Sequence, residues 1–426
     1  MLASMHSPGL TRLINIGLRG MTLVSKFLLI FFLAGYLEPA ELGLYGLVAA
    51  TISYAIYPLG FDFYTYSTRE LLKQDRSQWA SLLKNQGTLH LALYAVVLPL
   101  LLLVFVYELL PWHLAGLFFI VLILEHINQE LNRLLIAISM QLTASWVLFL
   151  RSGLWGLILV LWMYYDPTVR SLQVVMIAWS IGGFLALTLA CLTFYRLRLT
   201  GWWSPIDWRW ILKGLKVAIP LLLATLALQG VLTLDRYWFE ALQGLEVLAA
   251  YVLFMSMANA LMTFLDAGVF SFTYPKLIST HHEKRHGEFG KALKQSLVLC
   301  AILTGLFVIG ASIAIVPLLS LLNKEVYIQQ LSLFPWILLI ASLYAFSMVP
   351  HYALYAQGYD KAIIYSHLTA FLLFGLVTWL FSTFLPEKAV LLGLVAAFSV
   401  LLIWKTWAFY RLTPKSYRSA AKAETH

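Results

Sequence analysis

Long apolar runs are the feature of this sequence that most limits how the chain can fold. A helix needs about 20 mainly apolar residues to cross the hydrocarbon core of a bilayer, whereas a membrane-spanning strand needs about half as many. About twelve runs of helical length are present. Because lipid offers no water to backbone groups, such runs must be helices. They cover residues 13–36, 42–64, 89–106, 114–136, 146–164, 172–195, 217–234, 247–272, 297–318, 334–355, 362–385 and 390–407.

Composition excludes a soluble fold. Hydrophobic residues make up 61% of the 426 residues and charged residues only 12%. A soluble domain is about 45–50% apolar and about 25% charged. No soluble core could bury so much apolar surface, so the bilayer must be the solvent. We predict an all-α polytopic membrane protein of about twelve transmembrane helices.

Lysine and arginine gather in alternate loops. One set of loops holds only Arg170, Arg236, Lys324 and Lys388. The positive side of a membrane protein faces the cytoplasm, so both termini are predicted to be cytoplasmic. This topology accounts for the net charge of +9, and we predict no nucleic-acid partner. The other set holds Arg12, Arg69, Lys73, Arg76, Lys84, Arg196, Arg198, Arg209, Lys213, Lys216, Lys276, Lys284, Arg285, Lys291, Lys294, Lys361, Arg411, Lys415, Arg418 and Lys422.

The chain divides in the middle. Residues 196–213 form a polar, tryptophan-rich connection, and tryptophan prefers the headgroup level, so we expect this linker to lie along the inner membrane surface. It separates an N-terminal lobe, residues 1–195, from a C-terminal lobe and tail, residues 214–426. Weak similarity between residues 41–45 and 247–251 indicates two repeats of the same orientation. Pro220 in the seventh run and Gly17 and Gly20 in the first predict bendable helices at corresponding places.

The first run carries a polar stripe. Arg12, Asn15, Arg19, Thr22 and Lys26 follow spacings of three and four, which place them on one helical face. Charges within the membrane are costly and mark functional sites. One interpretation is a cationic stripe that lines a water-filled cavity and meets an anionic substrate. In the alternative, Arg19 reaches the inner interface and Lys26 pairs with a carboxylate.

A second polar cluster lies in the inner half of the fourth run. Glu130 and Arg133 are three residues apart and can form an ion pair, while His126 shares their face. Glu125 lies on an adjacent face. The cluster is interpreted as a structural network or a proton relay. A metal site is disfavoured because no second ligand set appears at matching spacing, so we predict no metal.

Arg151, in the inner half of the fifth run, completes a set of four cations in the first half of the chain with Arg19, Lys26 and Arg133. Arginine suits bidentate phosphate contacts, and lysine acts as a point charge. The set therefore predicts a phosphate-bearing ligand that enters from the cytoplasmic leaflet.

Carboxylates within the runs are candidates for balancing these cations or for carrying a coupling proton or sodium ion. They are Asp62, Asp266 and, beside Arg236, Asp235. Asp235 and Arg236 can also form a pair at the outer interface. His90 and His351 are interpreted as packing residues. The sequence contains no phosphate-binding glycine loop, HExxH, paired CxxC or Gly-x-Ser-x-Gly motif, so we do not predict an enzyme.

Three short segments carry a family resemblance: Gly-Leu-Arg-Gly at 17–20, Leu-Glu-Pro-Ala-Glu-Leu-Gly-Leu-Tyr at 37–45 and Leu-Asp-Arg at 234–236. With the span number and the halving, they resemble the Wzx polysaccharide flippases of the multidrug/oligosaccharidyl-lipid/polysaccharide (MOP) exporter superfamily. The resemblance implies two six-helix lobes around a central cavity. It also implies transfer of an undecaprenyl-diphosphate-linked oligosaccharide, such as an O-antigen unit, from the inner to the outer leaflet of the bacterial inner membrane by alternating access.

The same resemblance implies roles for the candidate residues. The diphosphate would meet Arg19, Lys26, Arg133 and Arg151. An ion gradient, of H⁺ or Na⁺, would give a coupling role to carboxylates, and no other cofactor is expected. A polysaccharide polymerase and a chain-length regulator would be partners. The coupling candidates are Asp62, Glu125, Glu130 and Asp266.

Other functions remain open at this stage. A multidrug exporter of the same superfamily, of the MATE type, would present acidic cavity walls to cationic drugs. A lipid II flippase would have about two further spans. A membrane glycosyltransferase or polysaccharide polymerase would need a substantial outward loop, and the outward loops here are short. A scaffold without transport activity would not require the charges within the membrane.

Overall fold

The computed structural model describes residues 8–418 and is all α-helical in that range. Twelve helical segments are long and apolar enough to cross a membrane, which confirms the predicted fold class. They are Leu13–Tyr36, Pro39–Gly60, Arg76–Val106, Trp112–Ala137, Gln141–Tyr165, Leu172–Arg196, Trp208–Gln243, Leu245–His282, His286–Leu322, Leu331–Ala356, Asp360–Ser382 and Ala389–Leu412.

The chain forms two compact units, Met1–Leu222 and Leu223–His426. The division falls within one long helix, α10 (Trp208–Gln243). Its first turns pack on the first unit, where Ile211 and Trp210 join Phe63 and Tyr66 in an apolar cluster. The predicted lobe boundary at 214 therefore lies inside the first unit as the structure has it. The nearby Trp203, in the predicted linker, is almost fully exposed.

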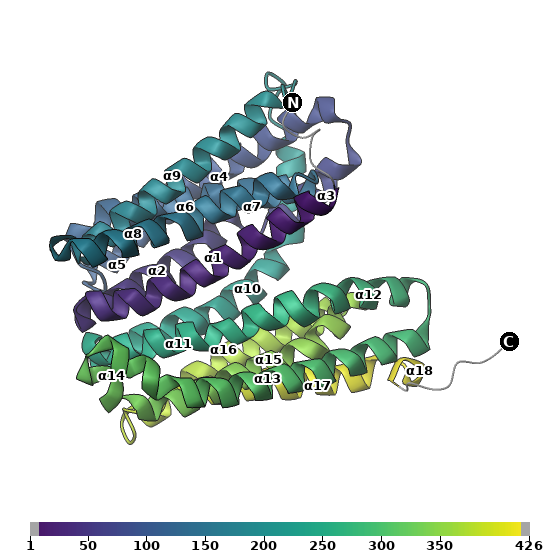
Figure 1. Cartoon of the computed structure of the whole chain (residues 1–426). Helices are drawn as coiled ribbons and strands as arrows, with labels where there is room; N and C mark the ends of the chain where they lie inside the picture. Colours follow the sequence, from purple (N-terminus) through teal and green to yellow (C-terminus); the bar gives the residue numbers. More distant parts are fainter. Residues whose placement is uncertain (1–7, 419–426) are drawn as a thin grey trace. The chain divides into compact units, whose positions relative to one another are not determined.

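The first unit contains the helices drawn in purple to teal in Figure 1. They are α1 (Pro8–Tyr36), α2 (Pro39–Gly60), α3 (Tyr64–Lys73), η1 (Arg76–Gln78), α4 (Trp79–Leu101), α5 (Leu103–Val106), η2 (Trp112–Leu114), α6 (Ala115–Ala137), α7 (Gln141–Phe149), η3 (Leu150–Leu154), α8 (Trp155–Tyr165), η4 (Pro167–Val169) and α9 (Leu172–Arg196), followed by the start of α10.

The second unit contains the rest of α10 and the helices drawn in green to yellow. They are α11 (Leu245–Leu265), η5 (Asp266–Phe270), α12 (Ser271–His282), α13 (His286–Leu322), α14 (Glu325–Gln329), η6 (Leu331–Leu333), α15 (Phe334–Ala356), α16 (Asp360–Ser382), α17 (Ala389–Leu412) and α18 (Lys415–Arg418). Within this unit, α17 packs against both α15 and α16.

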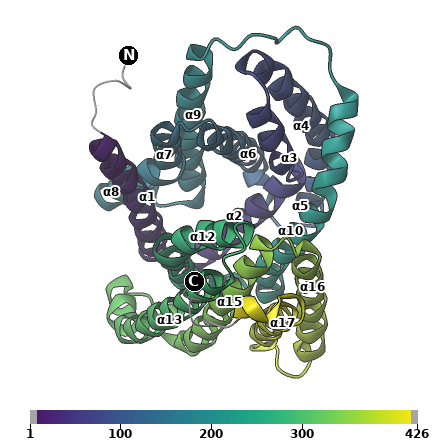
Figure 2. The same cartoon turned by 90° about the vertical axis from the view of Figure 1, so that its right-hand side faces the viewer.

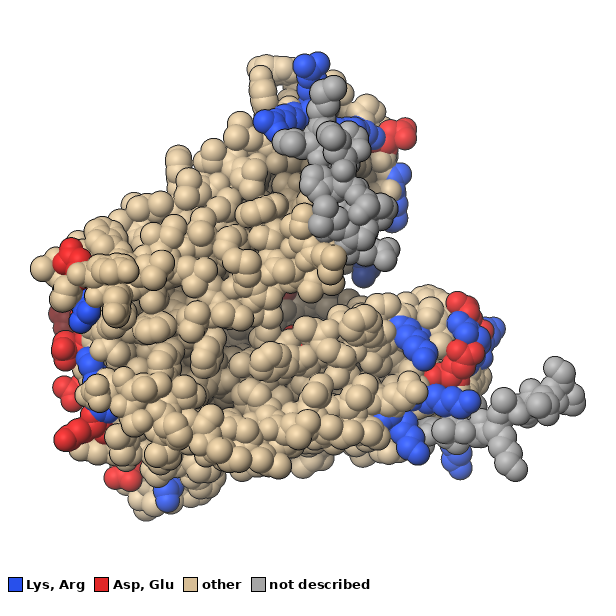
Figure 3. All heavy atoms as spheres, viewed as in Figure 1, with Lys and Arg blue, Asp and Glu red and all other residues tan. Residues whose placement is uncertain are grey.

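Charged side chains concentrate at the helix ends of each unit. In Figure 3 the flank of either unit is tan between its two ends, and blue and red spheres gather at the ends. Such a flank suits contact with lipid, because a charged side chain on it would have to leave water. The visible charge pattern thus agrees with the twelve candidate spans.

Two π turns and a residue of left-handed backbone conformation interrupt the regular helices. The first and seventh spans remain continuous helices through Gly20 and Pro220. The second span ends at Gly60, before the predicted residue 64, because Phe61 adopts a left-handed backbone conformation. The corresponding eighth span contains a π-helical turn, η5. A second π turn, η3, interrupts the fifth span. Such turns concentrate at functional sites, and they contain Asp266 and Arg151.

Candidate functional site

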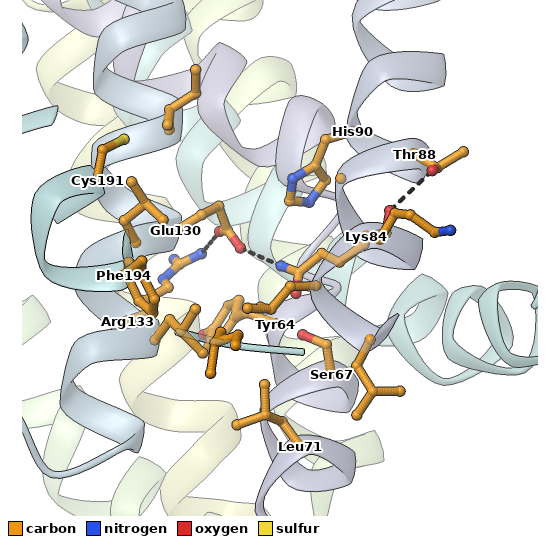
Figure 4. A pocket seen from close by; sticks show the side chains of 18 of the residues that line it. Tyr64, Ser67, Leu71, Lys84, Thr88, His90, Glu130, Arg133, Cys191 and Phe194 are labelled. Atoms are coloured by element: carbon orange, nitrogen blue, oxygen red, sulfur yellow. Dashed lines mark hydrogen bonds and ion pairs between the residues drawn. The ribbon is translucent and has the colours of Figure 1, made fainter. Parts of the chain in front are cut away.

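A cavity of about 1160 Å³ lies inside the first unit. Side chains of α3, α4, α6 and α9 line it, together with the segment that follows α9. Figure 2 shows the arrangement of these four helices, and Figure 4 shows side chains that line the cavity from close by. Most of the lining is apolar, and its charged groups are Lys84, Glu130, Arg133, Arg196 and Arg198. A site of this kind suits an amphipathic ligand.

The ion pair of Glu130 and Arg133 lies on the cavity wall (Figure 4). Arg133 Nη1 lies 2.7 Å from Glu130 Oε1, as their spacing of three residues predicts. The amide of Gln86 on α4 donates to the other carboxylate oxygen at 2.9 Å. The Arg133 guanidinium lies 3.7 Å from the centre of the Tyr64 ring. Glu130 and Arg133 therefore neutralise one another at this wall.

Two histidines and a tyrosine extend this network. The Tyr94 hydroxyl lies 2.6 Å from His126 Nδ1, and the rings of His90 and His126 meet edge to face at 4.9 Å. Gly60 brings the α2 backbone so close that a Cβ atom there would lie 3.1 Å from His126 Nε2 and 3.4 Å from Glu130 Oε1. Glycine at position 60 thus allows α2 to approach these α6 side chains closely. His90, interpreted from sequence as a packing residue, lines the cavity.

A second ion pair, Glu125 with Arg151, joins α6 to the π turn η3. Arg151 Nη2 and Nε lie 2.5 Å and 2.7 Å from Glu125 Oε2, with side-chain exposures of 13% and 8% for Arg151 and Glu125. Trp179 Nε1 donates to the other oxygen of Glu125 at 2.9 Å. Trp155 donates to the Arg151 carbonyl and stacks on Trp179 at 6.0 Å. Arg151 is therefore held by a carboxylate and is not among the lining residues of the cavity.

The stripe of the first span divides into exposed and buried members. Arg19 and Lys26 are exposed. Arg19 Nε donates to Ser145 Oγ at 3.3 Å, and this serine donates to Asn15 Oδ1. Thr22 is buried and donates to the Leu18 carbonyl within its own helix.

The charges of Arg151 and Glu125 act on Lys26, yet Lys26 forms no ion pair with any described residue. The direct carboxylate pairing of Lys26, an alternative from sequence, is therefore not seen. The side chain of Arg12 lies outside the described residues. Of the four predicted cations, Arg133 and Arg151 are paired with carboxylates, so the exposed positive charge of this set belongs to α1.

The remaining carboxylates lie apart from one another in the chain. Asp62 is buried in the turn after α2, outside the helix in which it was predicted, and its charge acts on Glu130. In the second unit Asp266 is exposed in η5. Asp235 is completely buried and accepts from the Tyr251 hydroxyl at 2.5 Å and from the Arg236 backbone amide. The contact between Asp235 and Arg236 is thus to the Arg236 backbone, and no ion pair of their side chains is present among the described residues.

No group of three or more His, Cys, Asp or Glu side chains arranged for a metal ion occurs among the described residues. In the cavity, His126 has its Nδ1 occupied by Tyr94.

Sequence reasoning missed Gln86, Tyr94 and Trp179, which lie on other helices and meet the α6 carboxylates and histidine only after folding. It also missed Lys405, a charge inside the twelfth apolar run and completely buried in the structure. A search for every charge within a run would have found Lys405.

Fold and site together define a polytopic helical membrane protein of two units with ion pairs buried within its membrane-spanning helices. No protein-family model and no curated protein matches the sequence. Among solved structures, the chain is similar to a multidrug resistance MATE family transporter of the MOP superfamily in an inward-facing conformation, with a TM-score of 0.77 at 13% identity. That alignment covers 96% of this chain and 99% of the other.

Two further structures are similar over nearly the full length. The MATE multidrug transporter DinF-BH has a TM-score of 0.66 at 13% identity, and the alignment covers 96% of each chain. A MOP superfamily transporter from Pyrococcus furiosus, reported with a binding pocket of reverse polarity, has a TM-score of 0.54 at 12% identity, and the alignment covers 95% of each chain. The chain therefore has a MATE-like fold, as predicted.

Proposed function

We propose that this chain is a transporter of the MOP superfamily that moves an amphipathic substrate across the bacterial inner membrane by alternating access. The observation that carries the proposal is the likeness to a MATE transporter over 96% of this chain and 99% of the other. The charged and hydrogen-bonded groups within the spans support it, because such groups are costly in lipid and mark transport pathways. We do not propose an enzymatic activity.

The similar solved structures favour a substrate of the kind that multidrug transporters export. Two of the similar structures are described as multidrug transporters. The cavity of the first unit also suits a flat organic cation, because Tyr64, Tyr94 and Phe194 line it beside Glu130. Aromatic faces attract cations. Against this, Arg133 already neutralises Glu130, and Lys84, Arg196 and Arg198 add positive charge to the lining.

A lipid-linked oligosaccharide is the second candidate, and a specific observation favours it. Arg19 and Lys26 are exposed on α1, and neither forms an ion pair with a described residue. Two cations within a span that are not neutralised by carboxylates favour an anionic group such as a diphosphate. On this hypothesis Asn15 and Thr22 support the stripe, and Asp62, Glu125, Glu130, Asp235, Arg236 and Asp266 balance charge or carry the coupling ion.

One experiment on a gene deletion separates the two substrates. Lipid-linked glycans and surface polysaccharide are extracted from the deletion strain, and accumulation of a fluorescent organic cation is measured in the same cells. Loss of surface polymer with single repeat units on undecaprenyl diphosphate at the inner leaflet identifies the flippase. Increased cation accumulation with unchanged polymer identifies the multidrug exporter. Neither change, in a strain without a second transporter of this fold, contradicts the proposed function.

A further inference from the structure

Three basic side chains that interact electrostatically lie inside the second unit, away from the site described above. Lys405 lies on α17, His351 on α15 and His367 on α16. Lys405 has 0% of its surface exposed, and its Nζ has no hydrogen-bond partner among the described residues. A lysine is almost never fully buried unless it is paired. The position of Lys405 therefore requires a physical explanation that packing does not supply.

The two histidines present unused ring nitrogens to the same region. His367, 6% exposed, has its Nδ1 3.2 Å from the Ala224 carbonyl oxygen, which only accepts, so Nδ1 carries the hydrogen. In the neutral ring its Nε2 then carries a lone pair and can only accept, and this atom is buried without a partner among the described residues. His351 stacks on His367 at 6.0 Å with planes 3° apart, and its Nδ1 is buried and unpartnered in the same way. The charge of Lys405 acts on both rings.

Charge repulsion limits how many protons this cluster holds. Three positive groups side by side would repel one another in a medium of low dielectric. Lys405 forms no ion pair with any carboxylate in the described part of the chain. Closely coupled groups bind their protons in shared steps, so a proton on one group disfavours a proton on the next. Simultaneous protonation of all three groups is therefore disfavoured.

Other titratable groups face the cluster through α15. The Tyr352 ring packs edge-on against His351 at 5.6 Å, and Tyr355 stacks on it at 6.4 Å. Tyr274 of α12 packs on both tyrosines. Asp266 in η5 is exposed, and its charge acts on Tyr352.

The charged groups of α10, by contrast, are distant along the helix from Ala224, the residue through which α10 contacts the cluster. Lys216, Asp235 and Arg236 are more than two helical turns from Ala224.

We propose that Lys405, His351 and His367 form a proton-binding site inside the second unit. The bound proton resides on one of the imidazoles or on the Lys405 amine. Use of this site to drive transport rests on the proposed function, whereas binding of the proton does not.

The protonation of Lys405 can be measured without a substrate. The full chain is labelled with ¹⁵N at lysine Nζ, reconstituted in lipid, and followed by solid-state NMR as pH is varied. The Lys405 signal is the one lost in K405M or in K405R, either variant sufficing if the other fails to fold. K388M, an exposed lysine just before the same helix, is the matched control.

We expect the Lys405 signal to change between the ammonium and amine positions over the pH range in which the protein stays folded. In H367Q we expect this change to occur at a different pH. A signal that stays at the ammonium position throughout, or one that responds to added chloride rather than to pH, overturns the proposal. The chloride response would identify a small-anion site instead.

Proton uptake into proteoliposomes, followed with an internal pH dye, tests the coupling role. We expect wild-type protein and K388M to take up protons with the substrate gradient, and K405M and K405R to lose this uptake. Titration of Lys405 with unchanged uptake in K405M would keep the proton site and refute coupling through it. Failure of wild-type protein to transport either substrate class would count against the proposed function and would leave the NMR result intact.

Discussion

Replacing Arg151 by methionine isolates one interaction of the first unit and predicts a large loss of stability. The variant keeps a long side chain in η3 but leaves the Glu125 carboxylate, whose side chain is 8% exposed, with Trp179 as its remaining donor. Breaking a buried ion pair by removing one partner costs about 3–5 kcal/mol. For a unit of this size the loss corresponds to a fall in Tm on the order of 6–20 °C. Thermal unfolding of the purified protein in detergent measures it.

The double variant R151M/E125Q tests the role of this ion pair. Replacing both members of a buried pair by neutral groups is often close to neutral, so the double variant should recover most of the stability lost in R151M. Arg285, which pairs with Glu283 and Glu288 at 44–55% exposure, is the matched control, and R285M should change stability by less than about 1 kcal/mol. An R151M variant as stable as R285M, or a double variant no better than R151M, would refute the assigned role of this pair.

Three further outcomes are expected. Substituting Arg19 or Lys26 by glutamine should abolish export while the protein remains in the membrane at its normal level, as measured by substrate accumulation and immunoblotting. Gly60→Ala should lower stability by about 1–3 kcal/mol, because its Cβ would press on His126 and Glu130. Tyr251→Phe should lower it by about 1.5–3 kcal/mol, because the fully buried Asp235 carboxylate loses its hydroxyl donor. Unfolding in detergent checks both values.

Each of these outcomes has a control in the same chain. Lys361→Gln, at the exposed start of α16, should leave export unchanged. Gly87 on α4 has nothing within 4 Å of an added Cβ, so Gly87→Ala should stabilise the helix by up to about 1 kcal/mol. Equal effects of the two glycine substitutions would contradict the close approach of α2 to α6. Normal export by both α1 variants would contradict a substrate-binding role of the stripe.

Features set by local spacing were accessible from sequence. The twelve spans follow from the length of the apolar runs, because a bilayer of fixed thickness selects helices of fixed minimum length. The Glu130–Arg133 ion pair follows from a spacing of three on one helix. A family resemblance and the number of spans led to the MATE-like fold, which the solved structures confirm.

Contacts between distant segments were decided by tertiary structure alone. The spacing of the first span predicts which residues share a face but not that Thr22 is buried while Arg19 and Lys26 are exposed. Arg151 looked like a free cation for a ligand because its partner, Glu125, lies 26 residues earlier on another helix.

The same holds for Lys405, whose electrostatic interaction with two histidines depends on how α15, α16 and α17 pack. Helical periodicity determines which residues share a face. It contains no information about which face of another helix they contact. That pairing of faces decides whether a charged side chain is neutralised by a partner, exposed, or buried without a partner.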